Sequence, residues 1–228
     1  MFGEGPDRKV GALAVSLAGY VSAVNELTQN EFERIYGPVA PLTMAQVADL
    51  FADAPFRWWI CGGWSLELTE TPRRQHEDVE VGIARAELSL VREWLSDYHV
   101  WDIHDGALTL LTAERQLPDD HEQLWVRRDA FSPWLMDLML TPIDGDTWHY
   151  KRDPRLTRPM SEAVVVGSDG IPRQRPEIGL LFKARRRFPR DEEDFAAVLP
   201  TLSATDRAWL RDAIDMTEPP GNPWLEQL

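Results

Sequence analysis

The sequence predicts an α+β fold, in which a strand-rich middle lies between two helical ends. Apolar residues recur at helical spacing near both ends, and short β-branched or aromatic runs separated by Asp-Gly turns fill the middle. The first strand–helix–strand unit spans about residues 57–84. This order predicts an N-terminal helical extension (1–42), a core with a mixed sheet (43–170) and a helical C-terminal segment (171–228).

Helices are predicted in six segments of the chain. The first ends before Gly37, and the second begins at Thr43, a residue type that caps helix N-termini. Pro176 opens the first helix of the C-terminal segment, a position that proline favours. The six predicted helices are residues 8–36, 43–54, 85–98, 176–188, 190–202 and 203–216, and residues 63–70 look like the first turns of another.

Strands are predicted where short apolar or alternating runs are bounded by turn residues. The Asp105-Gly106 pair marks a hairpin turn inside one of them. The strand-forming runs are residues 56–61, 76–84, 100–112, 122–128 and 133–142, with shorter ones within 144–153 and 162–174.

Composition excludes several classes of protein. The 228 residues carry a formal net charge of −14, which argues against a protein that grips a long nucleic acid. This charge suits a cationic ligand, or it only keeps an acidic protein in solution. A single cysteine, Cys61, excludes an intramolecular disulfide, and no signal-peptide pattern or apolar run of about 20 residues is present. We therefore expect a cytoplasmic protein with no membrane partner.

Three acids lie in predicted strands. Asp78 and Glu80 are two residues apart and project from the same face of an extended chain. Adjacent like charges are costly unless a cation neutralises them, and Mg²⁺ binds one or two carboxylates together with substrate phosphates. The alternative is an edge strand with a hydrated polar face. Asp137 interrupts the apolar run "WLMDLML", where a buried acid needs a partner.

A double glycine, Gly62-Gly63, follows the strand at 56–61 and precedes a predicted helix. Backbone N–H groups at such a turn bind phosphates, and Ser65 adds a hydroxyl nearby, although most Gly-Gly pairs are ordinary turns. Three acids from two neighbouring strands and a glycine turn together predict a two-metal site for phosphoryl transfer.

The combination "GGWSLEL…RRQHEDVEV" resembles the nucleotidyltransferase superfamily shared with DNA polymerase β. Within it, the chain is similar to the small aminoglycoside and lincosamide nucleotidyltransferases, whose motif is a Gly-Gly-Trp turn followed by His-x-Asp-x-Asp/Glu. The tail "PEIGLLFKARRRFPRDEEDFAAVLPTLSATDRAWL" resembles the helical C-terminal segment of that group. The resemblance covers about residues 55–215 and implies a mixed-sheet nucleotidyltransferase core flanked by helices.

The resemblance also implies roles for individual residues. Gly62 and Gly63 correspond to the turn that holds the nucleoside triphosphate. Asp78 and Glu80 correspond to the two metal-binding acids, and Asp137 to the third acid, which binds metal or acts as base toward the acceptor hydroxyl. Glu80 is a departure, since many members carry Asp there, and its extra methylene shifts a bound ion enough to matter at a reacting centre.

Positive side chains are needed to hold the β- and γ-phosphates. Lys183 is the first candidate, because the resembling tail carries a lysine there, and Arg74 is the second; the alternative for both is a solvated surface role. His76 faces the same side as Asp78 and supports a metal-binding carboxylate or a phosphate, or is a plain turn residue. The other histidines lack metal-ligand spacing and are expected to be structural: His99, His104, His121 and His149.

The resemblance implies a Mg²⁺-dependent enzyme that moves a nucleoside monophosphate, AMP from ATP, onto a hydroxyl of a small molecule and releases pyrophosphate. A cationic aminoglycoside antibiotic suits the net charge, with Asp144 and Asp146 as acids near its path, and antibiotic resistance would follow. One alternative is nucleotidylation of a protein or tRNA, although RNA binding needs a basic face. Another is a degenerate nucleotide-binding module, against which the presence of all three acids argues.

Overall fold

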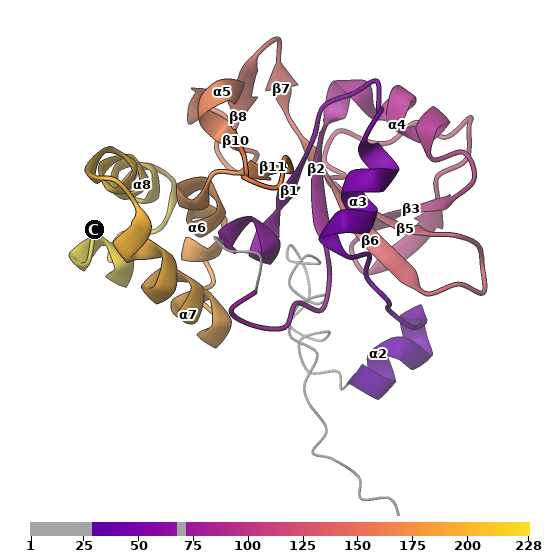
Figure 1. The fold of residues 1–228 in the computed structure, drawn as a ribbon, viewed down its shortest axis with the longest axis horizontal. Helices are drawn as coiled ribbons and strands as arrows, with labels where there is room; N and C mark the ends of the chain where they lie inside the picture. Colours follow the sequence, from indigo (N-terminus) through magenta and orange to yellow (C-terminus); the bar gives the residue numbers. More distant parts are fainter. Residues whose placement is uncertain (1–28, 68–71) are drawn as a thin grey trace, which may run out of the picture. The chain divides into compact units, whose positions relative to one another are not determined.

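The computed structural model describes residues 29–67 and 72–228, which form two compact units. Of the described residues, unit 1 comprises 29–57, Gln75–Ile83 and Glu87–Leu140, and unit 2 comprises 58–67, 72–74, Ala84–Ala86 and Thr141–Leu228. Both contain sheet and helices (Figure 1), so the predicted α+β class is confirmed. Most of the first predicted helix lies outside the described residues. No helix in the described ranges is long and apolar enough to cross a membrane.

The sheet of unit 1 has the strand order β2-β6-β5-β3-β4. Strands β3, β5 and β6 pair antiparallel, and the register places Trp125 opposite both Trp101 and Asp137. Asp105 and Gly106 both adopt positive φ, as the two-residue turn between β3 and β4 requires. The strands are β2 (Glu80–Ala84), β3 (His99–His104), β4 (Ala107–Leu110), β5 (Gln123–Arg127) and β6 (Trp134–Thr141).

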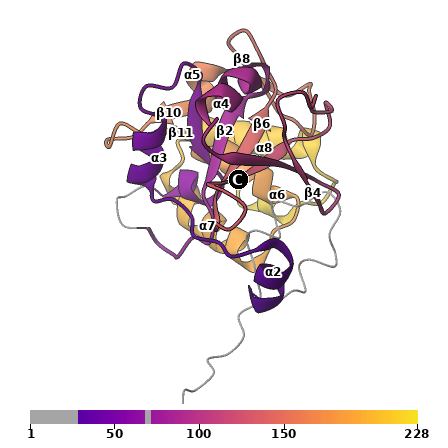
Figure 2. The same cartoon turned by 90° about the vertical axis from the view of Figure 1, so that its right-hand side faces the viewer.

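The described part of unit 1 contains the helices α2 (Gln29–Tyr36), α3 (Met44–Phe51) and α4 (Leu88–Trp94), the last preceded by the 3₁₀ turn η3 (Arg85–Glu87). Gly37 ends α2 with a left-handed φ of 96°, and Thr43 caps α3 through a capping box with Gln46, as predicted. The indole of Trp94 donates to the carbonyl of Leu50, 2.9 Å away, and so ties α4 to α3. Figures 1 and 2 place α2 at the opposite end of unit 1 from α4.

An aromatic cluster anchors α2 to the sheet of unit 1. Phe32 is fully buried and lies 6.0 Å, centroid to centroid, from Trp125, which contacts Trp134 at 5.2 Å. Burial of aromatic rings of this size contributes a large part of a core's hydrophobic stabilisation. Trp125 is directly opposite Asp137 in the register, so this core fixes the position of that acid along β6.

Unit 2 contains the strands β10-β11-β1 and, separately, the antiparallel strands β7-β8-β9. In chain order they are β1 (Trp58–Cys61), β7 (Ile143–Asp144), β8 (Thr147–His149), β9 (Thr157–Pro159), β10 (Val164–Val166) and β11 (Pro172–Gln174). Its helices are η2 (Gly62–Leu66), α5 (Met160–Ala163), α6 (Pro176–Ala184), α7 (Pro189–Val198), η4 (Leu199–Thr201), α8 (Ala204–Thr217) and η5 (Pro223–Glu226).

Helices α6, α7 and α8 form the helical part of unit 2 (Figure 1). Pro176 opens α6 as predicted, and the Ser203 hydroxyl caps α8 by accepting from the Asp206 N–H. Near the C-terminus, Trp224 is fully buried and its ring stacks on that of Phe195 with centroids 4.1 Å apart. This stacking fastens η5 to α7.

Two predicted elements differ in the structure. The helix predicted from residue 63 is instead the five-residue 3₁₀ helix η2, which ends where Glu67 adopts an extended backbone. The strand predicted over 76–84 begins only at Glu80, so Asp78 lies in the segment before it. In addition, Gly82 is buried along with Val81 and Ile83, so β2 is covered on both faces and the predicted alternation is incomplete.

Candidate active site

The three predicted metal-binding acids all belong to unit 1. Asp78 precedes β2, Glu80 is its first residue, and both are half-buried, whereas Asp137 on β6 is only 2% exposed. The N–H of Asp137 donates to the carbonyl of Val79 at 2.9 Å. Since Val79 lies between Asp78 and Glu80, the fold brings the backbone of the third acid against that of the first two.

Gln123 on β5 holds the carboxylate of Asp137. Its side-chain amide donates to Asp137 Oδ2 at 2.7 Å, and both residues are buried. The register explains the contact, because Trp125 is opposite Asp137 and Gln123, two residues away, shares its face. Sequence reasoning missed Gln123, although a polar residue at the start of an apolar strand was a signal.

The donor atoms of these three acids are of the type that Mg²⁺ binds. Carboxylate oxygens are the hard ligands that Mg²⁺ takes from proteins, commonly one or two acids with substrate oxygens completing the shell. A carboxylate as buried as that of Asp137 is stabilised by a cation more than by hydration. The chemistry of the residues therefore supports a magnesium site at the junction of β2 and β6.

The double glycine lies in unit 2, at the end of β1 and the start of η2. Gly62 adopts a φ of 60°, a conformation that residues with a Cβ rarely take. Ser65 is 2% exposed, and its hydroxyl donates to the carbonyl of Gly62 at 2.8 Å. This hydrogen bond joins the two ends of the turn, so Ser65 stabilises the conformation of the turn.

Helix α6 packs very closely against this glycine turn. A Cβ added to Gly179 would lie 2.8 Å from Leu66 Cδ2 and 3.2 Å from Ser65 Oγ. Real Cβ atoms essentially never come as close as the first of these distances. Gly179 is thus required in the middle of a helix, where glycine otherwise costs stability, because it lets α6 approach η2.

The two predicted phosphate-binding cations, Arg74 and Lys183, meet at one carboxylate of unit 2. Asp194 on α7 is 1% exposed and lies 3.2 Å from the Arg74 guanidinium and 3.1 Å from Lys183 Nζ. Arg73 lies 3.4 Å from the same carboxylate, and Asp191 lies 2.7 Å from Lys183 Nζ. Arg74 and Lys183, far apart in sequence, therefore share a buried anionic partner that sequence reasoning missed.

The protonation of Asp194 reflects these neighbours. Burial raises the pKa of its carboxyl, but the hydrogen bonds and charges of Arg74 and Lys183 outweigh burial and hold the pKa below its ordinary value. Asp194 is therefore charged at neutral pH. The signal in the sequence was the spacing of Asp191 and Asp194, which places both on one face of a helix; in the structure both are buried.

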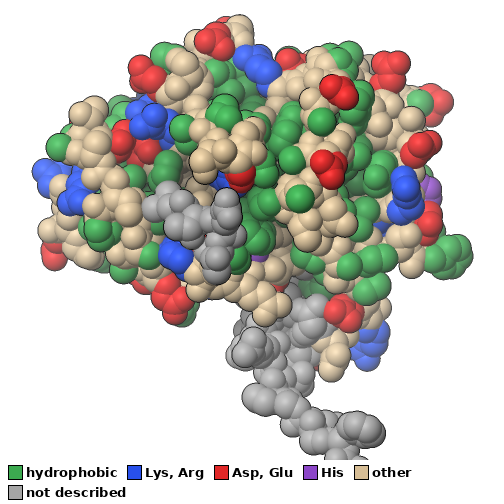
Figure 3. All heavy atoms as spheres, in the orientation of Figure 1, with side chains coloured by type: hydrophobic (Ala, Val, Ile, Leu, Met, Phe, Trp, Pro, Cys, Tyr) green, Lys and Arg blue, Asp and Glu red, His purple; other side chains and the backbone are tan. Residues whose placement is uncertain are grey.

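His76 is buried, at 9% exposure, in the segment that leads to Asp78. A histidine in a plain turn would be more exposed. The role of His76 in hydrogen bonding to a carboxylate or a phosphate stays a prediction. The predicted acceptor acids, Asp144 and Asp146, are exposed near the turn between β7 and β8 of unit 2. On the face drawn in Figure 3, acidic side chains are spread singly among other residues.

The comparisons with known proteins point to one family of enzymes. The family model "Aminoglycoside-2''-adenylyltransferase" matches residues 43–117. The chain resembles the aminoglycoside nucleotidyltransferases. The match to the aminoglycoside-2''-adenylyltransferase model includes the glycine turn, Arg74, His76, Asp78 and Glu80, whereas Asp137 and Lys183 lie beyond it. No curated protein matches the chain.

Two solved structures of an aminoglycoside nucleotidyltransferase share the fold. A crystal structure of ANT(2'')-Ia in complex with adenylyl-2''-tobramycin superimposes with a TM-score of 0.51, at 10% identity, over 76% of this chain and 95% of that one. A solution structure of the antibiotic-resistance factor ANT(2'')-Ia gives 0.50, at 12% identity, over 75% and 88%. The predicted resemblance is therefore confirmed, and at these identities the superpositions establish the fold alone.

Proposed function

We propose that this protein is a Mg²⁺-dependent adenylyltransferase that moves AMP from ATP to a hydroxyl of an aminoglycoside and releases pyrophosphate. The observation that carries the proposal is the backbone bond from Asp137 to Val79, which sets the third acid against the Asp78–Glu80 pair. The family-model match over residues 43–117 and the shared fold support it. The crystal structure of ANT(2'')-Ia, which contains adenylyl-2''-tobramycin, supports it as well.

In this proposal the three acids hold the metal and Asp137 also faces the acceptor. When bound, Mg²⁺ supplies charge neutralisation at the α-phosphate. Asp137 takes the proton of the acceptor hydroxyl while the oxygen of that hydroxyl forms a bond to the α-phosphorus. The bond between the α-phosphorus and the oxygen that bridges to the β-phosphorus breaks, and pyrophosphate leaves. Gln123 fixes one oxygen of Asp137, so the carboxylate keeps its orientation through the transfer.

The phosphates of ATP are assigned to groups of unit 2. The N–H groups of the Gly62-Gly63 turn and the head groups of Arg74 and Lys183 are the donors. Asp194 already orders both cations, so less side-chain freedom is lost when a triphosphate binds. Ser65 keeps the turn in shape through its bond to the Gly62 carbonyl.

A polycationic acceptor is favoured by the formal net charge of −14, because an acidic protein raises the local concentration of cations. Asp144 and Asp146 are exposed acids suited to contact its amino groups. The single cysteine suits a reducing cytoplasm, where ATP and an imported antibiotic are both present.

The test is incubation of the purified chain with ATP, Mg²⁺ and an aminoglycoside panel, followed by mass spectrometry of the small molecules. The expected result is a mass gain of one AMP residue on at least one aminoglycoside, with pyrophosphate release. Asp78→Asn should abolish it, while Glu77→Gln, the same change of charge on the adjacent exposed residue, should retain it. No transfer to any member, or label on a protein or RNA band instead, would refute the proposal.

A further inference from the structure

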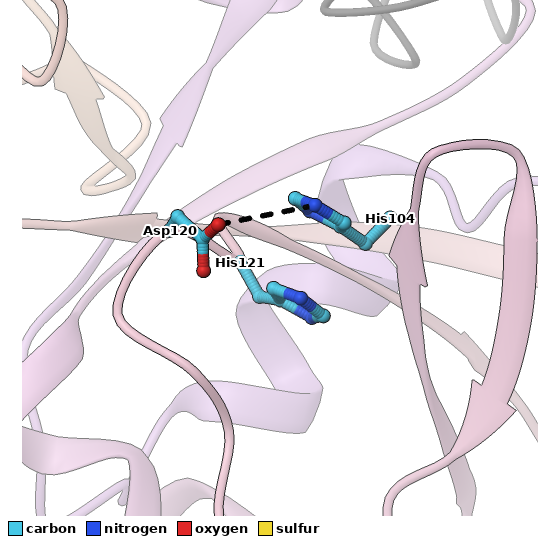
Figure 4. Close-up of side chains that lie close together, drawn as sticks. All are labelled: His104, Asp120 and His121. Carbon is cyan, nitrogen blue, oxygen red and sulfur yellow. Dashed lines mark ion pairs between the residues drawn. The ribbon is translucent and has the colours of Figure 1, made fainter.

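Two histidines and an aspartate form a cluster in unit 1 that shares no residue with the three acids described above. His104 ends β3, and Asp120 and His121 lie in the segment between β4 and β5. One ligand atom from each of the three side chains lies within 4.8 Å of the others. Figure 4 shows the imidazole rings of His104 and His121 face to face; their centroids are 3.8 Å apart and their planes differ by 5°.

The fold, and not local spacing, brings these groups together. Strand β3 pairs with both β4 and β5, so the end of β3 lies beside the segment that enters β5. The expectation that His104 and His121 have only structural roles rested on their spacing in the sequence. Spacing alone does not describe this cluster, because it combines residues from two segments that are joined through the sheet.

A buried carboxylate orients one of the two histidines. Asp102 on β3 is 1% exposed, and its Oδ2 lies 2.8 Å from Nδ1 of His121 and 2.7 Å from the Arg115 guanidinium. A carboxylate at that distance favours the tautomer in which Nδ1 carries the proton and Nε2 carries the lone pair. This is the carboxylate–histidine arrangement that metal sites use to fix a ligand's orientation and raise its basicity.

The donor set selects the kind of ion. Two imidazoles and one carboxylate suit Zn²⁺ and similar transition metals, whereas Mg²⁺ prefers oxygen ligands alone. Zinc bonds of about 2.0–2.1 Å put tetrahedral ligands roughly 3.3 Å apart. Nε2 of His104 and Oδ2 of Asp120 are 4.0 Å apart (the dashed line in Figure 4). Because an imidazole binds a metal in the plane of its ring, the ring of His104 must also turn out of its stack on His121 for both histidines to reach one ion. The side chains of His104 and Asp120 are solvent-accessible, at 34% and 77%, and have room to move.

We propose that His104, Asp120 and His121 bind a Zn²⁺-like transition-metal ion, with water as the fourth ligand. The ion would join the β3–β4 hairpin to the start of β5. His121 lies two residues before Gln123, whose amide holds Asp137. Metal binding therefore stabilises the strand that carries this contact, independently of whether the chain transfers AMP.

The test is calorimetric titration of the metal-free full chain with Zn²⁺ in excess Mg²⁺, which saturates sites built from oxygen ligands. One Zn²⁺ per chain is expected, together with a rise in melting temperature. His104→Gln and Asp120→Asn should each weaken the affinity at least about tenfold. Both positions are accessible, so the variants should fold. His149→Gln and Asp97→Asn remove an imidazole and a carboxylate outside the cluster, and both variants should bind Zn²⁺ with the affinity of the wild type.

Cobalt supplies a second readout that does not depend on activity. Co²⁺ at the site should give the visible absorption of a low-coordinate ion with nitrogen ligands, and His104→Gln should lose it. The proposal is overturned by any of three results: no Zn²⁺ bound in excess Mg²⁺, equal affinity in His104→Gln and His149→Gln, or a cobalt spectrum unchanged by His104→Gln.

Discussion

Asp194→Asn tests how much the buried carboxylate of Asp194 contributes to the stability of the protein. The substitution keeps the size of the side chain and removes its charge, so Arg73, Arg74 and Lys183 lose a shared anionic partner at 3.1–3.4 Å. Removing one partner of a buried ion pair costs about 3–5 kcal/mol. The three cations are 34%, 23% and 14% exposed and regain water, so the loss should lie near the lower end, about 3 kcal/mol.

For a chain of this length, about 3 kcal/mol corresponds to a fall of roughly 6–12 °C in melting temperature. Thermal unfolding at neutral pH followed by circular dichroism measures it. Glu193→Gln is the matched control, because it makes the same charge change on the adjacent, exposed residue of α7. If the two variants melt within a degree of each other, the reasoning that Asp194 organises the three cations is wrong.

The same variant has a defined pH dependence. The pKa of Asp194 is lower in the folded than in the unfolded protein. Its contribution to the free energy of unfolding is therefore fully present above the unfolded pKa of about 3.9 and is lost as pH falls through the folded pKa. The difference in unfolding free energy between wild type and Asp194→Asn should therefore be constant from pH 7 to about 5 and narrow below about pH 4. A difference that widens at low pH would contradict this sign.

Three further changes have direct structural readouts. Gln123→Leu removes a hydrogen bond to a buried carboxylate and should lower the unfolding free energy by about 1.5–3 kcal/mol in urea titrations, and by much less in an Asp137→Leu background. Gly179→Ala sets a Cβ against Leu66, so overpacking of about 1–3 kcal/mol should outweigh the helix-propensity gain of about 1 kcal/mol; a higher melting temperature would show that α6 can shift. Trp224→Ala should cost about 3–5 kcal/mol in the same titrations, because it removes a buried ring stacked on α7.

The sequence was most informative where local rules decide the structure. Caps and turns follow from single residues, so the Thr43 cap, the end of α2 at Gly37 and the Asp105-Gly106 turn could all be predicted. The close approach of α6 to the turn at Gly62 could not, because Gly179 and Leu66 are far apart in the chain.

The contacts that hold the candidate site could not be predicted, because they join segments far apart in the chain. Gln123 meets Asp137 through the β5–β6 register, and Asp194 meets Arg74 through the packing of α7. Polar residues of this kind show no periodicity of their own, and a single sequence does not reveal which buried donor faces which acceptor. The three acids could be singled out in the sequence because carboxylates in or beside apolar strands signal an unusual electrostatic requirement, and their role as metal ligands stays a prediction.

One arrangement recurs at each of the chemically suggestive groups. Asp137 is held by Gln123, Lys183 is held by Asp194, and His121 is held by Asp102, and in each pair the holding residue is almost fully buried. A buried partner fixes a side chain's position, because an alternative rotamer would leave a polar group without its hydrogen bond. Near-isosteric substitutions of Gln123, Asp194 and Asp102 should therefore reduce activity or metal affinity, although the side chains that they orient remain unchanged. The same changes at exposed neighbours should leave both unaltered, because no buried hydrogen bond depends on them.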